Sequence, residues 1–151
     1  MRDRYDFGGN KIYMSCTPLK GSGTVPDSGY SIETTHGQYA SFVFFIGDNI
    51  DDNADILMTF LLSSNEADAT EDMTIYIEAR KSDNSEAAAW NVENGTAFTF
   101  DSFPAEQLSK YQYTLSASDY EVGDGIIVSV MNNTTTATVK VLNCTIELTV
   151  K

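Results

Sequence analysis

The sequence is short of the residue types on which the common catalytic and scaffold chemistries depend. Its 151 residues include one histidine, two cysteines, three prolines and one tryptophan. Serine and cysteine triads need a histidine base, and zinc sites normally need more than one nitrogen or sulfur ligand. His36 lies in a predicted turn between Thr35 and Gly37, and no carboxylate pair or glycine-rich phosphate loop stands out. We therefore expect no enzyme.

Positive charge is also scarce. Nine Lys and Arg oppose 22 Asp and Glu, which gives a formal net charge of −13. Binding to a phosphate backbone or to an anionic membrane surface depends on clustered Lys and Arg. Neither nucleic acid nor a membrane is therefore expected as a partner. The acidic excess favours solubility, and repulsion between copies must be overcome wherever the chain assembles.

Long hydrophobic runs are missing. The strongest run, Phe42 to Ile46, has the length of a strand and is too short to span a bilayer. The first residues, M-R-D-R-Y-D-F, lack the apolar segment of a signal peptide, so we expect synthesis in a cytoplasm. The length of the chain fits one domain.

Strand patterns are what the sequence does contain. Residues 119–151 form the clearest stretch: a turn D-Y-E-V-G-D-G, the apolar run I-I-V-S-V-M, the polar turn N-N-T-T-T, and a long alternating run to the end. Asn94-Gly95 is the strongest hairpin-turn signal in the chain. About eight to ten short strands, with no helix longer than a turn, predict an all-β fold, an antiparallel β-sandwich or barrel.

The inward faces of these strands predict the core, with the register of each face open by one residue. Its predicted members are Phe42, Phe44, Ile46, Leu57, Ile75, Ile77, Ile127, Val139, Val141, Ile146 and Leu148. Cys16 and Cys144 fall in the first and last predicted strands, which can be neighbours in a sandwich, so a bridge is geometrically conceivable. Cytoplasmic synthesis favours two buried reduced thiols instead.

Residues 1–28 are rich in glycine and proline and predict an extended N-terminal arm, ahead of a sandwich domain over residues 29–151. The arm is either a loose terminus or a segment that packs on a neighbouring copy. Five apolar side chains could make that oligomer or particle contact: Tyr5, Phe7, Ile12, Tyr13 and Met14.

An acidic loop over residues 48–55 is the candidate metal site. Asp51, Asn53 and Asp55 have a D-x-N-x-D spacing that can wrap oxygen ligands around calcium. The rest of the EF-hand pattern fails, because Ile56 stands at the glycine position and Leu62 at the bidentate glutamate position. A solvated acidic loop without calcium is the favoured interpretation, and no other cofactor is expected.

Aromatic residues suggest a second kind of site. Trp90 and Tyr76, together with other tyrosines, could form a platform on which a glycan stacks. Tryptophan is highly buried on average, so a place in the core or at an interface is the favoured interpretation of Trp90.

The order of strands resembles the jelly-roll domains of tailed-bacteriophage virion proteins. The resemblance rests on four segments: A-D-I-L-M-T-F-L-L-S-S, M-T-I-Y-I-E-A-R, Y-T-L-S-A-S-D-Y-E-V-G-D-G-I-I-V-S-V-M-N-N and T-A-T-V-K-V-L-N-C-T-I-E-L-T-V. It implies a jelly-roll-like sandwich and a non-enzymatic virion structural protein, such as a capsid decoration protein or a head or tail fibre component. Such proteins are commonly homotrimers and contact other virion proteins. The alternative is a carbohydrate-binding β-sandwich module, with or without calcium.

Overall fold

The computed structural model describes residues 10–19, 21–23, 31–65, 72–80, 93–99 and 108–151. These residues form nine strands and one 3-10 turn. They are β1 (Lys11–Cys16), β2 (Ile32–Thr34), β3 (Tyr39–Phe45), β4 (Ile56–Ser64), β5 (Asp72–Arg80), β6 (Glu93–Thr99), β7 (Leu108–Leu115), η1 (Ala117–Asp119), β8 (Gly125–Asn132) and β9 (Val139–Thr149). No helix within the described ranges is long and apolar enough to cross a bilayer.

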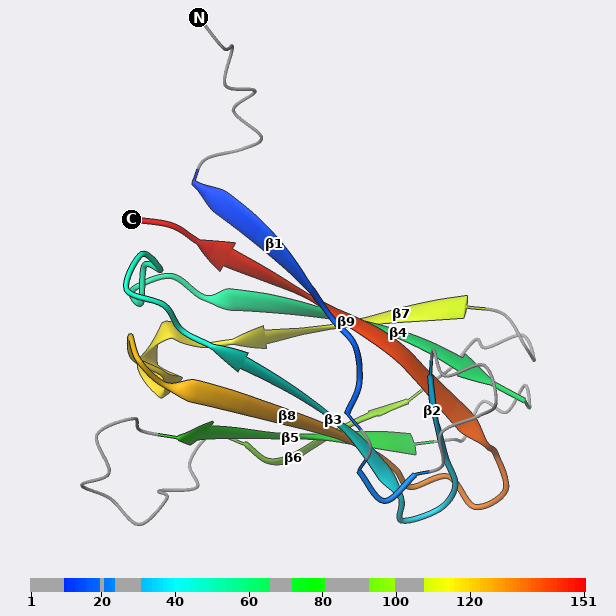
Figure 1. The fold of residues 1–151 in the computed structure, drawn as a ribbon. Coiled ribbons are helices and arrows are strands. Elements are labelled where there is room, and N and C mark those ends of the chain that lie inside the picture. Colours follow the sequence, from blue (N-terminus) through cyan, green and yellow to red (C-terminus); the bar gives the residue numbers. More distant parts are fainter. Residues whose placement is uncertain (1–9, 20, 24–30, 66–71, 81–92, 100–107) are drawn as a thin grey trace, which may run out of the picture.

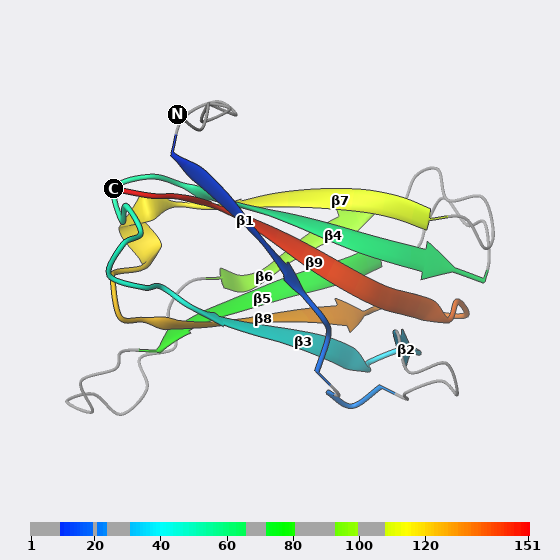
Figure 2. The same cartoon turned by 45° about the horizontal axis from the view of Figure 1, so that its top comes forward.

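The strands form two antiparallel sheets that lie face to face (Figures 1 and 2). Sheet A has the order β1-β9-β4-β7, and β2 pairs with the other end of β9; sheet B has the order β3-β8-β5-β6. From β3 to β5, and again from β7 to β9, the chain alternates between the two sheets. The all-β, jelly-roll-like sandwich predicted from the sequence is therefore confirmed.

The core lies between the sheets and follows the period-2 alternation of each strand. Phe42 of sheet B and Phe60 of sheet A are both fully buried, and their rings meet edge to face with centroids 6.0 Å apart. Nine of the eleven predicted core residues are buried. The prediction is wrong for Leu57 and Ile127. Each is half-buried on the outer side of its sheet, and its neighbours in the strand point inward instead.

Strand β9 changes the face that it presents to the core part-way along its length. Val139 and Val141 point inward, two half-buried residues follow, and from Cys144 onward the even-numbered residues are buried. The pairing with β4 shifts at the same place, between Leu61 and Leu62. This β-bulge turns the odd-numbered residues 143, 145 and 147 to the outer face of sheet A.

The sequence predicted a hairpin turn at Asn94-Gly95, and this prediction is wrong. It lies inside β6, opposite Tyr76 of β5, where the pairing register shifts between Ile75 and Ile77. Two residues opposite one is the arrangement of a β-bulge, which also favours residues that tolerate unusual backbone angles.

Part of the predicted N-terminal arm is a strand of the sandwich. β1 lies at the edge of sheet A and pairs with β9; Ile12 and Met14 pack against the core, and Tyr13 is 61% exposed on the opposite face. Tyr5 and Phe7 lie outside the described residues. The contacts of these five residues with a neighbouring copy or particle remain a prediction.

Candidate functional site

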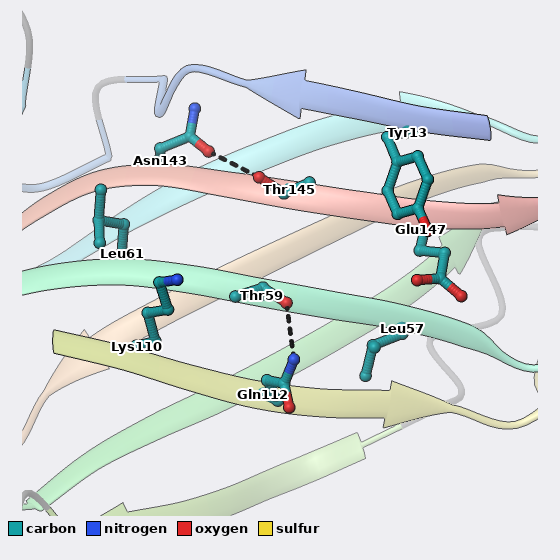
Figure 3. A pocket seen from close by; sticks show the side chains of 9 residues that line it. All are labelled: Tyr13, Leu57, Thr59, Leu61, Lys110, Gln112, Asn143, Thr145 and Glu147. Atoms are coloured by element: carbon teal, nitrogen blue, oxygen red, sulfur yellow. Dashed lines mark hydrogen bonds between the residues drawn. The ribbon is translucent and has the colours of Figure 1, made fainter. Parts of the chain in front are cut away.

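A groove runs over the outer face of sheet A and has a volume of about 390 Å³ (Figure 3). Ligand pockets in proteins typically measure about 300–1,000 Å³. Nine side chains from four strands line it: Tyr13 of β1; Asn143, Thr145 and Glu147 of β9; Leu57, Thr59 and Leu61 of β4; and Lys110 and Gln112 of β7. All nine point away from the core, so the groove uses residues that the fold itself leaves free.

The pairing register arranges these side chains in three rows across the sheet. The rows are Tyr13–Glu147–Leu57, then Thr145–Thr59–Gln112, then Asn143–Leu61–Lys110. Successive rows are two residues apart along each strand, which is about 7 Å. Tyr13 and Lys110 therefore stand at opposite ends, with a polar row between them, as Figure 3 shows.

The polar groups of the groove are held in place by hydrogen bonds. Gln112 Nε2 donates to Thr59 Oγ1 at 3.2 Å, and Thr145 Oγ1 donates to Asn143 Oδ1 at 3.3 Å. Asn143 Nδ2 in turn donates to Ser15 Oγ of the edge strand at 2.6 Å. The Gln112 carbonyl, its second N–H and the Thr59 hydroxyl hydrogen stay free of these bonds and are available to a ligand.

Charge in the groove is nearly balanced, although the chain carries a net charge of −13. The Glu147 carboxylate accepts a hydrogen bond from Lys11 Nζ at 2.7 Å. This hydrogen bond is the main cause that raises the pKa of Lys11 above its ordinary value. Lys110 supplies one cation at the other end of the groove. The surface therefore suits a ligand that is uncharged or nearly so.

The predicted calcium ligands Asp51 and Asp55 accept hydrogen bonds within the protein. Asp51 Oδ1 accepts hydrogen bonds from the backbone N–H (3.0 Å) and the Nδ2 (3.2 Å) of Asn53. Asp55 Oδ1 accepts from the backbone N–H of Ala117 at 2.9 Å, across to η1. In the part of the chain that the structure describes, no group of three or more His, Cys, Asp or Glu side chains is placed to hold a metal ion.

The acidic loop is also anchored by a buried tyrosine. The Tyr120 hydroxyl donates to the backbone carbonyls of Ala54 and Asp51, the latter at 3.4 Å, and the residue is 3% exposed. Burial raises the pKa of this phenol to about 12, and the carboxylates of Asp52, Asp51 and Asp55 add to the shift. The loop is thus built around a neutral hydrogen-bond donor.

Replacing Tyr120 by phenylalanine is expected to destabilise the fold by about 1–2 kcal/mol, because the partly buried carbonyls of Ala54 and Asp51 lose this donor. The pH dependence has a definite sign. Below the ordinary tyrosine pKa of about 10 both states keep the proton; as the pH rises from there to about 12, only the unfolded state loses it, so stability falls. Urea unfolding across this window should show a shallower fall for the variant than for the parent chain. An equal slope would contradict this assignment.

The remaining predicted site residues lie elsewhere. Tyr76 is half-buried on the outer face of sheet B, away from the groove, and Trp90 is outside the described residues. The His36 ring faces the Thr134 carbonyl with Nδ1 at 2.9 Å, a contact that requires Nδ1 to carry hydrogen. Sequence reasoning missed the groove, because its lining residues come from strands that are far apart in the chain.

Comparison with known proteins relates the chain to carbohydrate-binding modules through its fold. No protein-family model and no curated protein matches the sequence. Among solved structures, the chain resembles the xylan-binding module CBM15, with a TM-score of 0.53, 13% identity and coverage of 95% of this chain and 93% of the module. It also resembles the module CBM36 in complex with calcium and xylotriose, with a TM-score of 0.52, 13% identity and coverage of 89% and 97%.

A third structure, dimeric latent PorU from Porphyromonas gingivalis, matches with a TM-score of 0.59 and 9% identity. It covers 94% of this chain, which spans 13% of the length of PorU. Identities this low show a common jelly-roll sandwich and nothing finer.

The virion role, the virion location, the trimeric state and the absence of enzymatic activity remain predictions from the sequence.

Proposed function

We propose that this chain is a carbohydrate-binding module and that the groove on sheet A binds a neutral oligosaccharide. The observation that carries the proposal is the pairing of an exposed aromatic wall with a floor of hydroxyl and amide groups. Tyr13 is 61% exposed at one end of the groove, and the Thr145–Thr59–Gln112 row crosses its middle.

The chemistry of a sugar matches such a surface. A pyranose ring has apolar C–H faces, which pack against an aromatic ring, and hydroxyl edges, which both donate and accept hydrogen bonds. Tyr13 offers the aromatic face, and Gln112 and Thr59 offer donors and acceptors side by side. Because hydrogen bonds within the protein already orient these groups, less conformational entropy is lost on binding.

The size and charge of the groove narrow the ligand class. The three rows span about 14 Å along the strands, which is long enough for more than one sugar ring. One lysine and one paired glutamate leave no excess charge to attract a polyanion. The full-length structural neighbours named for xylan and xylotriose make short xylose oligosaccharides the first ligands to test.

Replacing Tyr13 by alanine is expected to weaken the binding of a neutral oligosaccharide by about tenfold or more, which corresponds to about 1.4 kcal/mol. The loss follows from removing the one aromatic wall of the groove. Isothermal titration calorimetry with xylotriose, and then with a panel of neutral oligosaccharides, measures it.

The matched control is Phe45→Ala. Phe45 is another exposed aromatic residue on an edge strand, 71% exposed, but it lies on the outer face of sheet B. This variant should bind as the parent chain does. Equal losses in both variants, or no binding to any glycan in the panel, would refute the proposal. A titration with a calcium chelator tests the calcium-assisted form, and we expect no change, because the Asp51 carboxylate already bonds to Asn53 and the Asp55 carboxylate to the backbone of Ala117.

A further inference from the structure

The two cysteines of the chain lie directly opposite each other in sheet A. Cys16 ends β1, Cys144 lies in β9, and the pairing register makes them Cα partners. Both side chains belong to the inner side of the sheet: Cys144 is fully buried, and Cys16 is partly buried against the same core. Both thiols are free in this structure.

This placement satisfies the geometric requirement for a disulfide. Directly opposed residues of an antiparallel pair have Cα atoms about 4.5–5.5 Å apart. Disulfides join residues whose Cα atoms are about 4.4–6.8 Å apart. The Cα separation expected for the pair therefore lies within the range that a disulfide spans.

We propose that Cys16 and Cys144 are a disulfide-forming pair whose oxidation fastens the edge strand β1 to the interior of sheet A. In the described ranges β1 has a strand partner on one side alone, so its other edge is open. A bridge at its last residue adds a covalent link at the point where the chain leaves the sheet.

The oxidant is a small-molecule disulfide such as oxidised glutathione. The Cys16 thiolate attacks one sulfur of the oxidant, which forms a mixed disulfide and releases one small thiol. Cys144 then loses its proton to solvent, attacks the Cys16 sulfur, and releases the second small thiol. Two protein thiols are oxidised to one disulfide, and one oxidant disulfide is reduced to two thiols.

The order of attack follows from burial. Cys16 is the more accessible sulfur, and Cys144 is enclosed by the core. Burial raises the pKa of both thiols, and that of Cys144 far more. Since the thiolate is the attacking form, the reaction should be slow at neutral pH and faster in mildly alkaline buffer.

The bridge also bears on the groove, and this consequence rests on the proposed function. β1 carries Tyr13, the aromatic wall, three residues before Cys16. Fastening β1 would restrict opening of that edge and hold the wall in its binding position. The oxidised chain should then bind its oligosaccharide more tightly than the reduced chain.

The test uses the full chain treated with oxidised glutathione at mildly alkaline pH, against a sample kept in a reductant. We expect the thiols that react under denaturing conditions to fall from two to none, the mass to fall by two hydrogens, and the chain to remain monomeric in non-reducing gels. The bridge closes a loop of more than 100 residues, so the melting temperature should rise by about 5 °C or more and return on reduction.

Cys16→Ser is the control variant, because its side chain is only partly buried. It should fold, show no rise in melting temperature on oxidation, and retain the Cys144 thiol. Two reactive thiols in the oxidised parent, a stable glutathione adduct, or a disulfide-linked dimer would each overturn the proposal. Calorimetry with the oligosaccharide is a separate readout: a bridge with a melting shift but no glycan binding would refute the proposed function and leave the disulfide pair standing.

Discussion

Replacing Asn132 by aspartate is expected to destabilise the fold by about 3 kcal/mol or more. Asn132 is fully buried at the end of β8, and its Nδ2 donates to the carbonyls of Thr34 at 2.7 Å and Ala137 at 3.1 Å. Its Oδ1 accepts from the N–H of Thr134 at 2.8 Å. Aspartate keeps the acceptor but loses both donors, and it turns a carboxylate oxygen towards two buried carbonyls. The Ala137 carbonyl keeps its bond from Thr134 Oγ1 at 2.9 Å, but repulsion from the buried charge and the lost donors should together cost about 3 kcal/mol or more.

The effect should be large because this one amide joins three segments. It connects β2, the end of β8 and the turn that leads into β9, and the backbone N–H and C=O of Asn132 also bond to Gln38 at 2.8 Å and Gly37 at 2.7 Å. Urea unfolding of the variant at neutral pH measures the loss. A buried carboxyl has a raised pKa, so the variant should be more stable at acidic pH, where the group is neutral, and lose stability as the pH rises.

The matched control is Asn133→Asp, the same chemical change one residue later. Asn133 is half-buried, and its Nδ2 contacts the Thr74 hydroxyl. A hydroxyl can donate as well as accept, so it can turn its hydrogen towards the new carboxylate. We expect a loss of less than about 1 kcal/mol there. Similar losses at both positions would show that Asn132 has no special role.

The fold could be predicted from the sequence where alternation was unambiguous. The apolar run Phe42 to Ile46 was predicted to have the length of a strand, and β3 covers Tyr39–Phe45, with its even-numbered residues inward. Where apolar residues stand at consecutive positions, as around Leu57 and Ile127, alternation does not decide which face is buried. There the register depends on contacts with the opposite sheet, which a single sequence does not reveal.

The candidate site could not be predicted for a different reason. Thr59, Gln112 and Thr145 look like ordinary outward-facing residues, each on its own strand. They form one row because β4 lies between β7 and β9, and because the bulge in β9 shifts its phase. Strand order and bulges depend on long-range pairing, which local patterns do not encode. The prediction of a hairpin turn at Asn94-Gly95 was wrong because the local sequence suits both a turn and a bulge, and long-range pairing decides between them.

Replacing Phe60 by alanine is expected to cost about 3–5 kcal/mol of folding stability, through lost apolar burial and the cavity left behind. Phe60 is fully buried in the central strand β4 and contacts the ring of Phe42 across the sandwich. Thermal and urea unfolding measure the loss.

The adjacent Leu61 points to the groove and is half-buried, so Leu61→Ala should cost about 1 kcal/mol in stability and act mainly on ligand binding.

The pair of variants separates the two faces of one strand. The folded fraction of Phe60→Ala should keep the oligosaccharide affinity of the parent chain, because the side chain does not reach the groove and the outward neighbours keep their register. If Leu61→Ala destabilised the chain as much as Phe60→Ala, the groove floor would belong to the core rather than to a binding surface. Because inward and outward side chains alternate along β4, Phe60→Ala should lose mainly stability, and Leu61→Ala should lose mainly oligosaccharide affinity.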